Sequence, residues 1–177
     1  MLKGNSNGSV NKVIYSFDTN IFIEIKKNYP KEPNKRLWDI IETRLNNREI
    51  VVSKEVLEEL KKGTDDLGKW LNKYPKSIIE SYEAIQDYVG YLVNKYIGWI
   101  DTNSTMNQAD PYVIAVGNYY KGVVVTQEKL HRYLDENLDQ IKLQAHSLKI
   151  PNICKLENIR CLDLVGFLVE IGDFSKD

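Results

Sequence analysis

Four carboxylates, Asp18, Glu59, Asp110 and Glu128, are the side chains in this sequence whose surroundings best suit chemistry. Asp18 and Glu128 stand at or shortly after the end of a short apolar run, and Asp110 directly precedes a proline. Ionised carboxylates that lie close together repel one another, so such a group requires protonation or a neutralising hard cation. Mg²⁺ or Mn²⁺ held by carboxylates and water activates water and stabilises the charge that develops when a phosphodiester is cleaved. The pattern therefore points to metal-assisted hydrolysis.

Cysteine and histidine chemistry finds little support in the sequence. Cys154 and Cys161 form no CxxC pair, and the two histidines are His131 and His146, which argues against a zinc site. Both histidines lie in a polar stretch without the glycine pattern of a nucleophile elbow, which argues against a Ser/His/Asp system. Carboxylates remain the favoured catalytic groups.

Composition predicts one compact domain without a bulk attraction for polyanions. The 177 residues are 42% hydrophobic and 28% charged, and 24 basic residues against 25 acidic ones leave a net charge of -1. The chain lacks the roughly 18 consecutive apolar residues of a spanning helix, and its first residues contain no apolar signal core. We therefore expect a cytoplasmic protein with a loose tail over residues 1–11, a single domain over 12–177, and no membrane partner.

Short apolar runs predict strands, and helical patterns separate them. Because strand, helix, strand order implies parallel pairing, we predict a three-layer α/β/α sandwich with a central, mainly parallel sheet of about four to five strands. Pro151 is expected to open a short helix and Asp163 to cap the last one. The predicted strands are 13–17, 50–52, 123–125 and 159–162, and the predicted helices include 37–45, 112–120, 152–156 and 164–171.

Two further segments are expected to be helical. Residues 66–96 carry apolar side chains, Ile78 and Ile79 among them, at spacings that suit one or two amphipathic helices. Residues 128–149 alternate charges and predict another helix or two. These segments would add extra helices to the sandwich.

Asp18 and Asp110 each have a structural alternative to a catalytic role. Asp18 follows a buried strand at its carboxyl end, where ligands bind in open α/β sheets, but Asp18 or Thr19 would also serve as the cap of a helix that begins near Ile21. Asp110 followed by Pro111 is a standard helix start, with the aspartate as N-cap. Each residue alone leaves the choice open.

Glu59 stands out among the three glutamates of the predicted helix that begins after Ser53 and ends at Gly63. At 100° per residue the helix buries a stripe that includes Val56 and Leu60, and Glu59 is the glutamate nearest its border. Glu55 and Glu58 fit a solvated face, where Glu58 would pair with Lys62.

The predicted topology brings the acids together. Carboxyl ends of parallel strands share one edge of the sheet, so Asp18 and Glu128 should lie on the same rim, and the helix starts near residues 53 and 110 can border it. We therefore predict that Asp18, Glu59, Asp110 and Glu128 converge.

Four motifs in this order resemble the PIN domain family of metal-dependent ribonucleases, which includes the toxins of many prokaryotic toxin-antitoxin pairs. Residues 17–23 (FDTNIFI) are similar to the family's opening strand and first acid, and residues 52–63 to its second motif, in which the acid precedes Leu. Asp110 with the apolar residues 113–116 resembles the third acid, and residues 124–128 (VVTQE) resemble the Thr-x-acid motif. The resemblance covers residues 13–171.

The resemblance implies a set of roles for the site residues. Asp18, Glu59 and Asp110 would bind one or two Mg²⁺ or Mn²⁺ ions with Glu128 in support, while three polar residues would orient carboxylates, water or phosphate. Two features depart from the family pattern: the fourth acid is Glu rather than the more common Asp, and residues 64–106 and 129–149 are longer than a minimal member needs. The three polar residues are Asn20, Ser53 and Thr126.

Basic and aromatic residues are candidates for RNA contacts. Local lysines suffice to bind a phosphate backbone, although solubility of helix surfaces is the plainer role for them. Some of the 11 tyrosines and 3 tryptophans could stack on bases, but Trp38, Trp70, Tyr82 and Tyr112 have the spacing of core residues. The candidate lysines are Lys26, Lys27, Lys61 and Lys62.

The leading hypothesis is a divalent-metal-dependent endoribonuclease, the toxin of a pair inhibited by a small antitoxin protein, and the resemblance also implies a homodimer. An alternative is a catalytically inactive PIN-like module that binds RNA or protein. A third, a phosphatase with Asp18 as nucleophile, would need a second aspartate where Asn20 stands.

Overall fold

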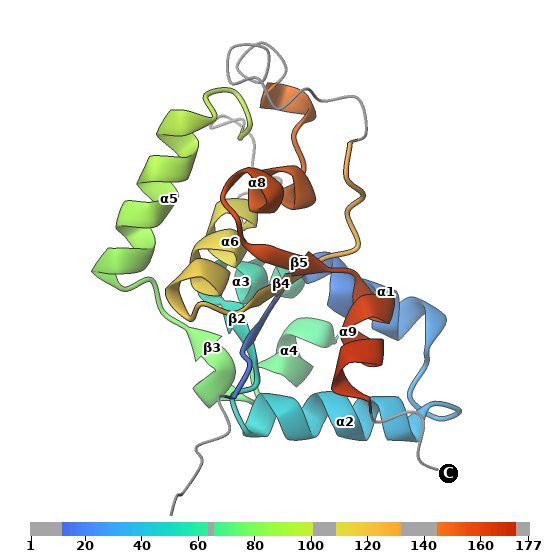
Figure 1. The fold of residues 1–177 in the computed structure, drawn as a ribbon. Helices are drawn as coiled ribbons and strands as arrows, with labels where there is room; N and C mark the ends of the chain where they lie inside the picture. Colours follow the sequence, from blue (N-terminus) through green and yellow to red (C-terminus); the bar gives the residue numbers. More distant parts are fainter. Residues whose placement is uncertain (1–11, 64–65, 101–108, 132–144, 173–177) are drawn as a thin grey trace, which may run out of the picture.

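A computed structural model describes residues 12–63, 66–100, 109–131 and 145–172. Within them a five-stranded sheet, entirely parallel, has the order β3-β2-β1-β4-β5 (Figure 1). The strands are β1 (Tyr15–Phe17), β2 (Ile50–Ser53), β3 (Ile78–Ile79), β4 (Val123–Val125) and β5 (Arg160–Leu162). The helices are α1 (Thr19–Asn28), α2 (Lys35–Asn46), α3 (Lys54–Lys62), α4 (Leu67–Leu71), α5 (Glu83–Lys95), α6 (Asp110–Tyr119), α8 (Ile150–Leu156) and α9 (Leu164–Ile171), with 3-10 turns η1 (Pro75–Ser77) and η2 (Ala145–Ser147).

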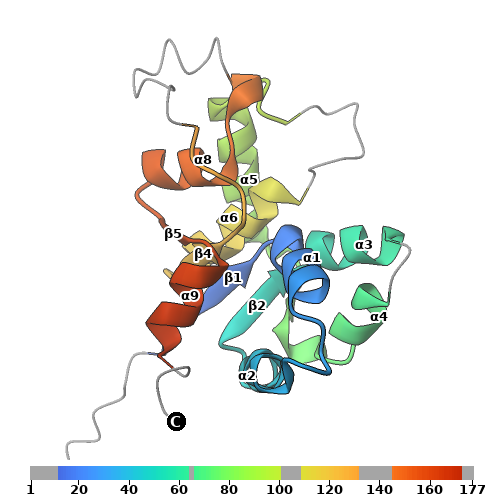
Figure 2. The same ribbon diagram turned by 90° about the vertical axis from the view of Figure 1, so that its right-hand side faces the viewer.

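Helices cover both faces of the sheet, which confirms the predicted three-layer sandwich. Helices α5, α6 and α8 lie on one face, and α1 to α4 with α9 lie on the other (Figure 2). Alternation along β1 explains the division, because neighbouring strand residues point to opposite faces. Tyr15 and Phe17 pack edge-on against Phe167 of α9, each with ring centroids 4.9 Å apart, whereas the Ser16 hydroxyl donates to the Val113 carbonyl of α6 at 2.8 Å.

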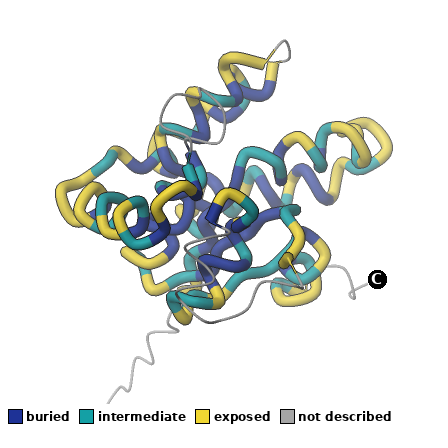
Figure 3. The backbone as a smooth tube through the Cα atoms, turned by 90° about the horizontal axis from the view of Figure 1, so that it is seen from above, coloured by how far each residue is buried: buried dark blue, intermediate teal, exposed yellow. Residues whose placement is uncertain are grey.

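The core follows the sheet, and buried residues concentrate along its strands and the inner sides of the helices (Figure 3). Trp38 and Trp70 belong to an aromatic cluster beneath α1, with ring centroids 5.2 Å apart, as their helical spacing predicted. Tyr82 is an exception to that prediction, because its side chain is 51% exposed at the start of α5. It packs against Tyr119 instead, with centroids 6.1 Å apart.

All four predicted strands are confirmed, but the helical prediction for residues 66–96 is wrong at Ile78 and Ile79. These two residues form edge strand β3, which pairs with Val52 and Ser53 of β2. Pro75 cannot donate a hydrogen bond to a continuing helix, and two β-branched residues after it favour an extended backbone. Two helices, α4 and α5, therefore flank an unpredicted strand.

Residues 128–149 are described only in part. Glu128 to His131 are not helical, and η2 is a single 3-10 turn, so the helical prediction is wrong at both ends of the segment. Its centre, residues 132–144, and the predicted tail over residues 1–11 lie outside the described residues. In the part of the chain that is described, no helix has the length and apolar character needed to cross a bilayer.

The added helix α5 is joined to α8 through one carboxylate. Glu157, which directly follows α8, accepts hydrogen bonds from Lys95 Nζ at 2.9 Å and Tyr96 Oη at 2.5 Å at the end of α5. The lysine and tyrosine together lower the pKa of Glu157 against the opposing effect of its burial. The extra helix thus supports the helix that begins beside the predicted acidic residues.

Gly122 sits where the chain leaves α6 and enters β4 against the backbone of Ile14. A Cβ at this position would lie 2.2 Å from the Ile14 carbonyl oxygen, so only glycine fits without a backbone shift. The close approach therefore constrains the backbone between α6 and β4.

We predict that Gly122→Ala destabilises the protein by about 1–3 kcal/mol, the usual cost of overpacking. Gly90→Ala in α5 is the matched control, because among the described residues no atom beyond its own stretch of helix lies within 4 Å of the position that its Cβ would take, and alanine favours the helix. Urea denaturation would measure both. Equal stabilities of the two variants would contradict the close approach at Gly122.

Candidate active site

The central strand β1 is where the chain order of the sheet reverses direction. From β1 the chain adds β2 and then β3 on one side, and it later returns to place β4 and β5 on the other. Such a switch point opens a crevice at the carboxyl ends of the strands. Asp18 directly follows β1 and Thr126 directly follows β4, so both stand at this crevice.

Asp18 is 4% exposed, and its carboxylate is held by a neighbouring strand end as well as by the backbone of Thr19 in its own helix. It occupies the N-cap position of α1, but its side chain makes no capping hydrogen bond. Instead, Oδ2 accepts a hydrogen bond from the Thr126 hydroxyl at 2.7 Å. Helix capping therefore does not account for the Asp18 carboxylate.

Asn20 and Thr126 form a hydrogen-bonded frame around Asp18. The Asn20 amide donates to the Thr126 hydroxyl at 3.1 Å, and its oxygen accepts from the Gln127 backbone at 2.8 Å. The backbone N–H of Glu128 also donates to the Thr126 hydroxyl at 3.1 Å. With these acceptor positions filled, the hydroxyl hydrogen is directed at Asp18. The frame places Asn20 and Thr126 beside Asp18, and an orienting role for them in catalysis stays a prediction.

Asp110 is the first residue of α6, not its N-cap as the sequence suggested. Ala109 takes the cap position and its carbonyl accepts from Val113 N at 2.9 Å. Among the described residues, none donates a hydrogen bond to the Asp110 carboxylate. Strand alternation directs Asp18, like Ser16, toward the face that α6 covers, and the Ser16 bond to Val113 holds that helix in place.

Glu59 joins the start of α1 to the start of α6. Its Oε2 accepts from the Thr19 hydroxyl at 2.7 Å, and its Oε1 accepts from the Ala109 backbone at 3.2 Å. Sequence reasoning did not give Thr19 this role. Ser53 caps α3, as predicted, by accepting from Val56 N at 3.3 Å.

The other two glutamates of α3 differ in detail from their prediction. Glu55 is half-buried rather than solvated, because it accepts a hydrogen bond from Ser81 at 3.0 Å. Glu58 is exposed, but it pairs with Lys61 at 2.8 Å and not with Lys62. A residue shortly after β3 therefore accounts for Glu55, and a prediction without β3 could not include it.

Glu128 is turned toward the start of α8. Its Oε2 accepts from the Ile150 backbone at 2.7 Å, and its Oε1 lies 3.5 Å from Lys149 Nζ. Lys149 also lowers the pKa of Asp110, against the larger effect of burial, so it is a cation at the site that sequence reasoning missed. Its position two residues before the predicted helix start at Pro151 was the available signal.

The four acids share one electrostatic environment. Burial raises the pKa of Asp18 to about 7, the hydrogen bond from Thr126 opposes this shift, and Glu128 and Glu59 add to it. Burial raises the pKa of Asp110 to about 8, with further repulsion from Asp18, Glu128 and Glu59. The fold therefore places the four acids within electrostatic reach of one another, while their convergence on one metal site stays a prediction.

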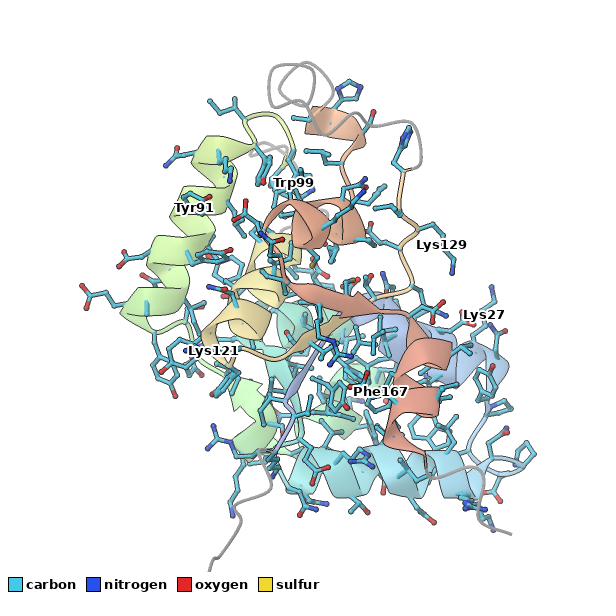
Figure 4. The ribbon with its side chains drawn as sticks, in the orientation of Figure 1. Lys27, Tyr91, Trp99, Lys121, Lys129 and Phe167 are labelled. Atoms are coloured by element: carbon cyan, nitrogen blue, oxygen red, sulfur yellow. The ribbon has the colours of Figure 1, made fainter. Side chains whose placement is uncertain are left out.

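The four lysines proposed for RNA contacts differ in exposure. Lys27, Lys61 and Lys62 are exposed and Lys26 is half-buried, and Figure 4 shows Lys27 directed outward from α1. Lys61 is engaged by Glu58. A role in RNA binding stays a prediction for all four.

The donor set is compatible with a hard divalent cation. Across the described ranges, no three Asp, Glu, His or Cys side chains stand in an arrangement that would hold a metal ion. Mg²⁺, however, is commonly bound by one or two carboxylates together with water and substrate oxygens. Asp18 supplies a buried carboxylate and Asp110 a half-buried one, and burial first and neighbouring acids second raise the pKa values of both. The residues present therefore fit Mg²⁺ or Mn²⁺.

Comparisons with known proteins support the fold. The sequence model of a domain of unknown function, DUF4411, matches residues 15–172, and a search of curated proteins finds no match. The crystal structure of VapBC2 from Rickettsia felis, bound to a DNA fragment from their promoter, contains a similar chain with a TM-score of 0.51. The two chains are 16% identical, and the similarity covers 85% of this chain and 98% of that one. The predicted PIN-like fold is thus confirmed.

We predict that Asp110→Asn stabilises the metal-free protein by more at pH 8 than at pH 5. An unfolded aspartate has a pKa of about 3.9, so the raised folded-state pKa gives stability that is present below this value and lost as pH rises to about 8. Relief of one pKa unit equals about 1.4 kcal/mol, or about 3–5 °C in Tm at this size.

Thermal unfolding in EDTA at both pH values would measure this difference. Asp39→Asn on the exposed side of α2 controls for the loss of one negative charge. A Tm gain for Asp110→Asn that is the same at pH 5 and pH 8 would contradict ionisation of the Asp110 carboxylate as its cause.

Proposed function

The chain belongs to the DUF4411 family, a domain of unknown function, and we propose that it is a divalent-metal-dependent endoribonuclease. The observation that carries the proposal is the pair Asp18 and Asp110, two carboxylates of raised pKa at the switch point of a PIN-like sheet. Repulsion between such groups is relieved when a hard cation binds. The motif resemblance to PIN ribonucleases supplies RNA as the substrate class.

Asp18 and Asp110 are the residues that would hold Mg²⁺ or Mn²⁺, with Glu59 and Glu128 in support. When bound, a divalent cation supplies an activated water and stabilises negative charge on the phosphate. Thr126 and Asn20 fix the orientation of the Asp18 carboxylate through the hydrogen bonds between the ends of β1 and β4. A fixed carboxylate keeps its oxygen atoms aimed at one point without reorganisation during the reaction.

Glu59 and Lys149 act on the surroundings of the two aspartates. Glu59 holds the Ala109 backbone and so fixes the start of α6, from which Asp110 projects. Lys149 forms an ion pair with Glu128. Asp18 and Asp110 are therefore the two acids that we expect to bind a cation. Lys27 and Lys62, both exposed, are our candidates for contacts to RNA phosphates.

We further propose that the ribonuclease is a toxin, that it forms a homodimer, and that a small antitoxin protein inhibits it. The sequence resemblance to PIN toxins supports this part of the proposal. The structural neighbour VapBC2, crystallised with a DNA fragment from their promoter, has a comparable fold. Growth arrest on expression, relieved by mutation of Asp18, would support a toxin, and light scattering of the purified chain would test the dimer.

One observation favours the alternative, an inactive PIN-like module that binds RNA or protein. The Glu59 carboxylate accepts hydrogen bonds from Thr19 and Ala109. The Glu128 carboxylate accepts one from Ile150 and pairs with Lys149. Two of the four acids therefore make structural contacts. The alternative predicts RNA binding without Mn²⁺ binding and without cleavage.

We expect Asp18→Asn to fold normally, to lose Mn²⁺ binding in calorimetry, and to cleave single-stranded RNA about 100-fold more slowly or worse, the scale on which one electrostatic stabiliser acts. Asp39→Asn is again the matched control and should retain both properties. Full cleavage by Asp18→Asn would overturn the proposed mechanism. Absence of Mn²⁺ binding and cleavage in the wild-type protein would favour the binding module.

Lys62→Glu should weaken RNA binding and its dependence on salt. Each lost phosphate contact lowers the slope of log K against log salt concentration by about 0.7 for a single strand. Lys35→Glu on α2, where the lysine side chain is 69% exposed, makes the same charge change elsewhere. Fluorescence anisotropy over a salt series would test both, and equal slopes for the two variants would remove Lys62 from the interface.

A further inference from the structure

Lys149 is a cation that the fold places among the acidic residues of the candidate active site. Its Nζ lies 3.5 Å from Glu128 Oε1. Its charge also lowers the pKa of Asp110, against the larger effect of burial. Glu128 follows β4 and Asp110 begins α6, so one lysine acts on carboxylates from two different elements.

The backbone of Lys149 is fixed, whereas its side chain is accessible. The Lys149 N–H donates to Asn152 Oδ1 at 3.2 Å, and the N–H of the next residue, Ile150, donates to Glu128 Oε2 at 2.7 Å. The Lys149 side chain is 47% exposed, compared with 17% for Glu128. The ammonium group has three donors, so it can pair with Glu128 and still donate to a substrate.

Glu59 and Glu128 have both carboxylate oxygens engaged by the protein itself. Each oxygen of Glu59 accepts a hydrogen bond, one at 2.7 Å and the other at 3.2 Å. One oxygen of Glu128 accepts from a backbone N–H at 2.7 Å, and the other lies 3.5 Å from Lys149. These two acids are therefore less available to a metal ion than Asp18 and Asp110.

One divalent ion is enough for the charge that these contacts leave. The ion pair of Glu128 and Lys149 is neutral as a unit, and two hydrogen bonds stabilise the Glu59 carboxylate. Asp18 and Asp110, once ionised, carry two negative charges, which one Mg²⁺ or Mn²⁺ matches. A second divalent ion would have to displace Lys149 from Glu128 or break the hydrogen bonds of Glu59.

We propose that Lys149 supplies the second positive charge of the site, that the site binds a single divalent ion, and that this lysine contacts the RNA phosphate at which cleavage occurs. The inference rests on the proposed function and deepens it. In two-metal sites the second ion stabilises the leaving oxygen, and a lysine ammonium supplies positive charge to a phosphate in the same way. Lys149 would then be a catalytic residue held in place by Glu128.

Titration calorimetry with Mn²⁺ at pH 8 tests the number of ions and the effect of the lysine charge. We expect one Mn²⁺ per wild-type chain. Lys149→Gln should bind Mn²⁺ about tenfold more tightly, because it removes a positive charge that repels the ion. The same variant should cleave single-stranded RNA about 100-fold more slowly. A purely structural role would not move affinity and rate in opposite directions, and Lys149→Arg, which keeps the charge, should keep the wild-type Mn²⁺ affinity.

Lys31→Gln is the matched control. Lys31, between α1 and α2, pairs with Glu42 of α2 at 2.6 Å, and the two side chains are 50% and 24% exposed. These values are close to those of Lys149 and Glu128. The control therefore removes one positive charge from a comparable ion pair and should leave Mn²⁺ affinity and cleavage unchanged.

The outcomes separate this inference from the proposed function. Two Mn²⁺ ions per wild-type chain, or no tighter binding by Lys149→Gln than by Lys31→Gln, would overturn the inference, and the ribonuclease would stand if the wild-type protein cleaves RNA. Cleavage by Lys149→Gln at the wild-type rate would overturn the contact with the phosphate. One Mn²⁺ per chain and tighter binding by Lys149→Gln, without RNA cleavage by the wild-type protein, would support the single ion and overturn the catalytic function. A wild-type protein that binds no Mn²⁺ would overturn both.

Discussion

The cost of ionising carboxylates in a largely dehydrated site, where burial acts first and mutual repulsion adds to it, is the constraint around which this end of the molecule is built. Asp18 and Asp110 come from elements 92 residues apart in the chain (110 − 18). The charge of Asp18 nevertheless adds to the raised pKa of Asp110, and Glu128 and Glu59 add to the raised pKa values of both aspartates. A local arrangement of side chains that lowers the stability of the fold is tolerated when it forms a binding site. The parallel sheet supplies the rigidity, since β1 and β4 pair in register and so place Asp18 and Thr126, the residues that follow them, side by side.

Most of the remaining polar contacts at the strand ends can be understood as responses to this repulsion. Thr126 directs its hydrogen at Asp18, Thr19 and Ala109 engage Glu59, and Ile150 with Lys149 engages Glu128. Asp110 alone of the four receives no such bond from a described residue. The contacts leave a deficit of positive charge centred on two aspartates, which is the property that a divalent cation would satisfy.

The sequence predicted the sheet core because apolar runs follow local rules, whereas the convergence of the four acids on one site stays a prediction. It missed β3 because Ile78 and Ile79 lie inside an apolar pattern that also fits a helix, and only pairing with β2 decides between them. It missed Lys149 and Thr19 because their partners, Glu128 and Glu59, are distant in the chain. The capping position of Ala109 in place of Asp110 depends on backbone geometry that residue types do not specify. Long-range contacts and backbone geometry, rather than local preferences, account for these differences.

The most direct measurement is the anomalous scattering of manganese in a crystal of the wild-type protein grown with Mn²⁺. The account predicts a peak within about 2.5 Å of carboxylate oxygens of both Asp18 and Asp110, the range of distances for hard cations and oxygen ligands, with Thr126 still bonded to Asp18. A fully ordered site with no peak between the two aspartates at saturating Mn²⁺ would contradict the account.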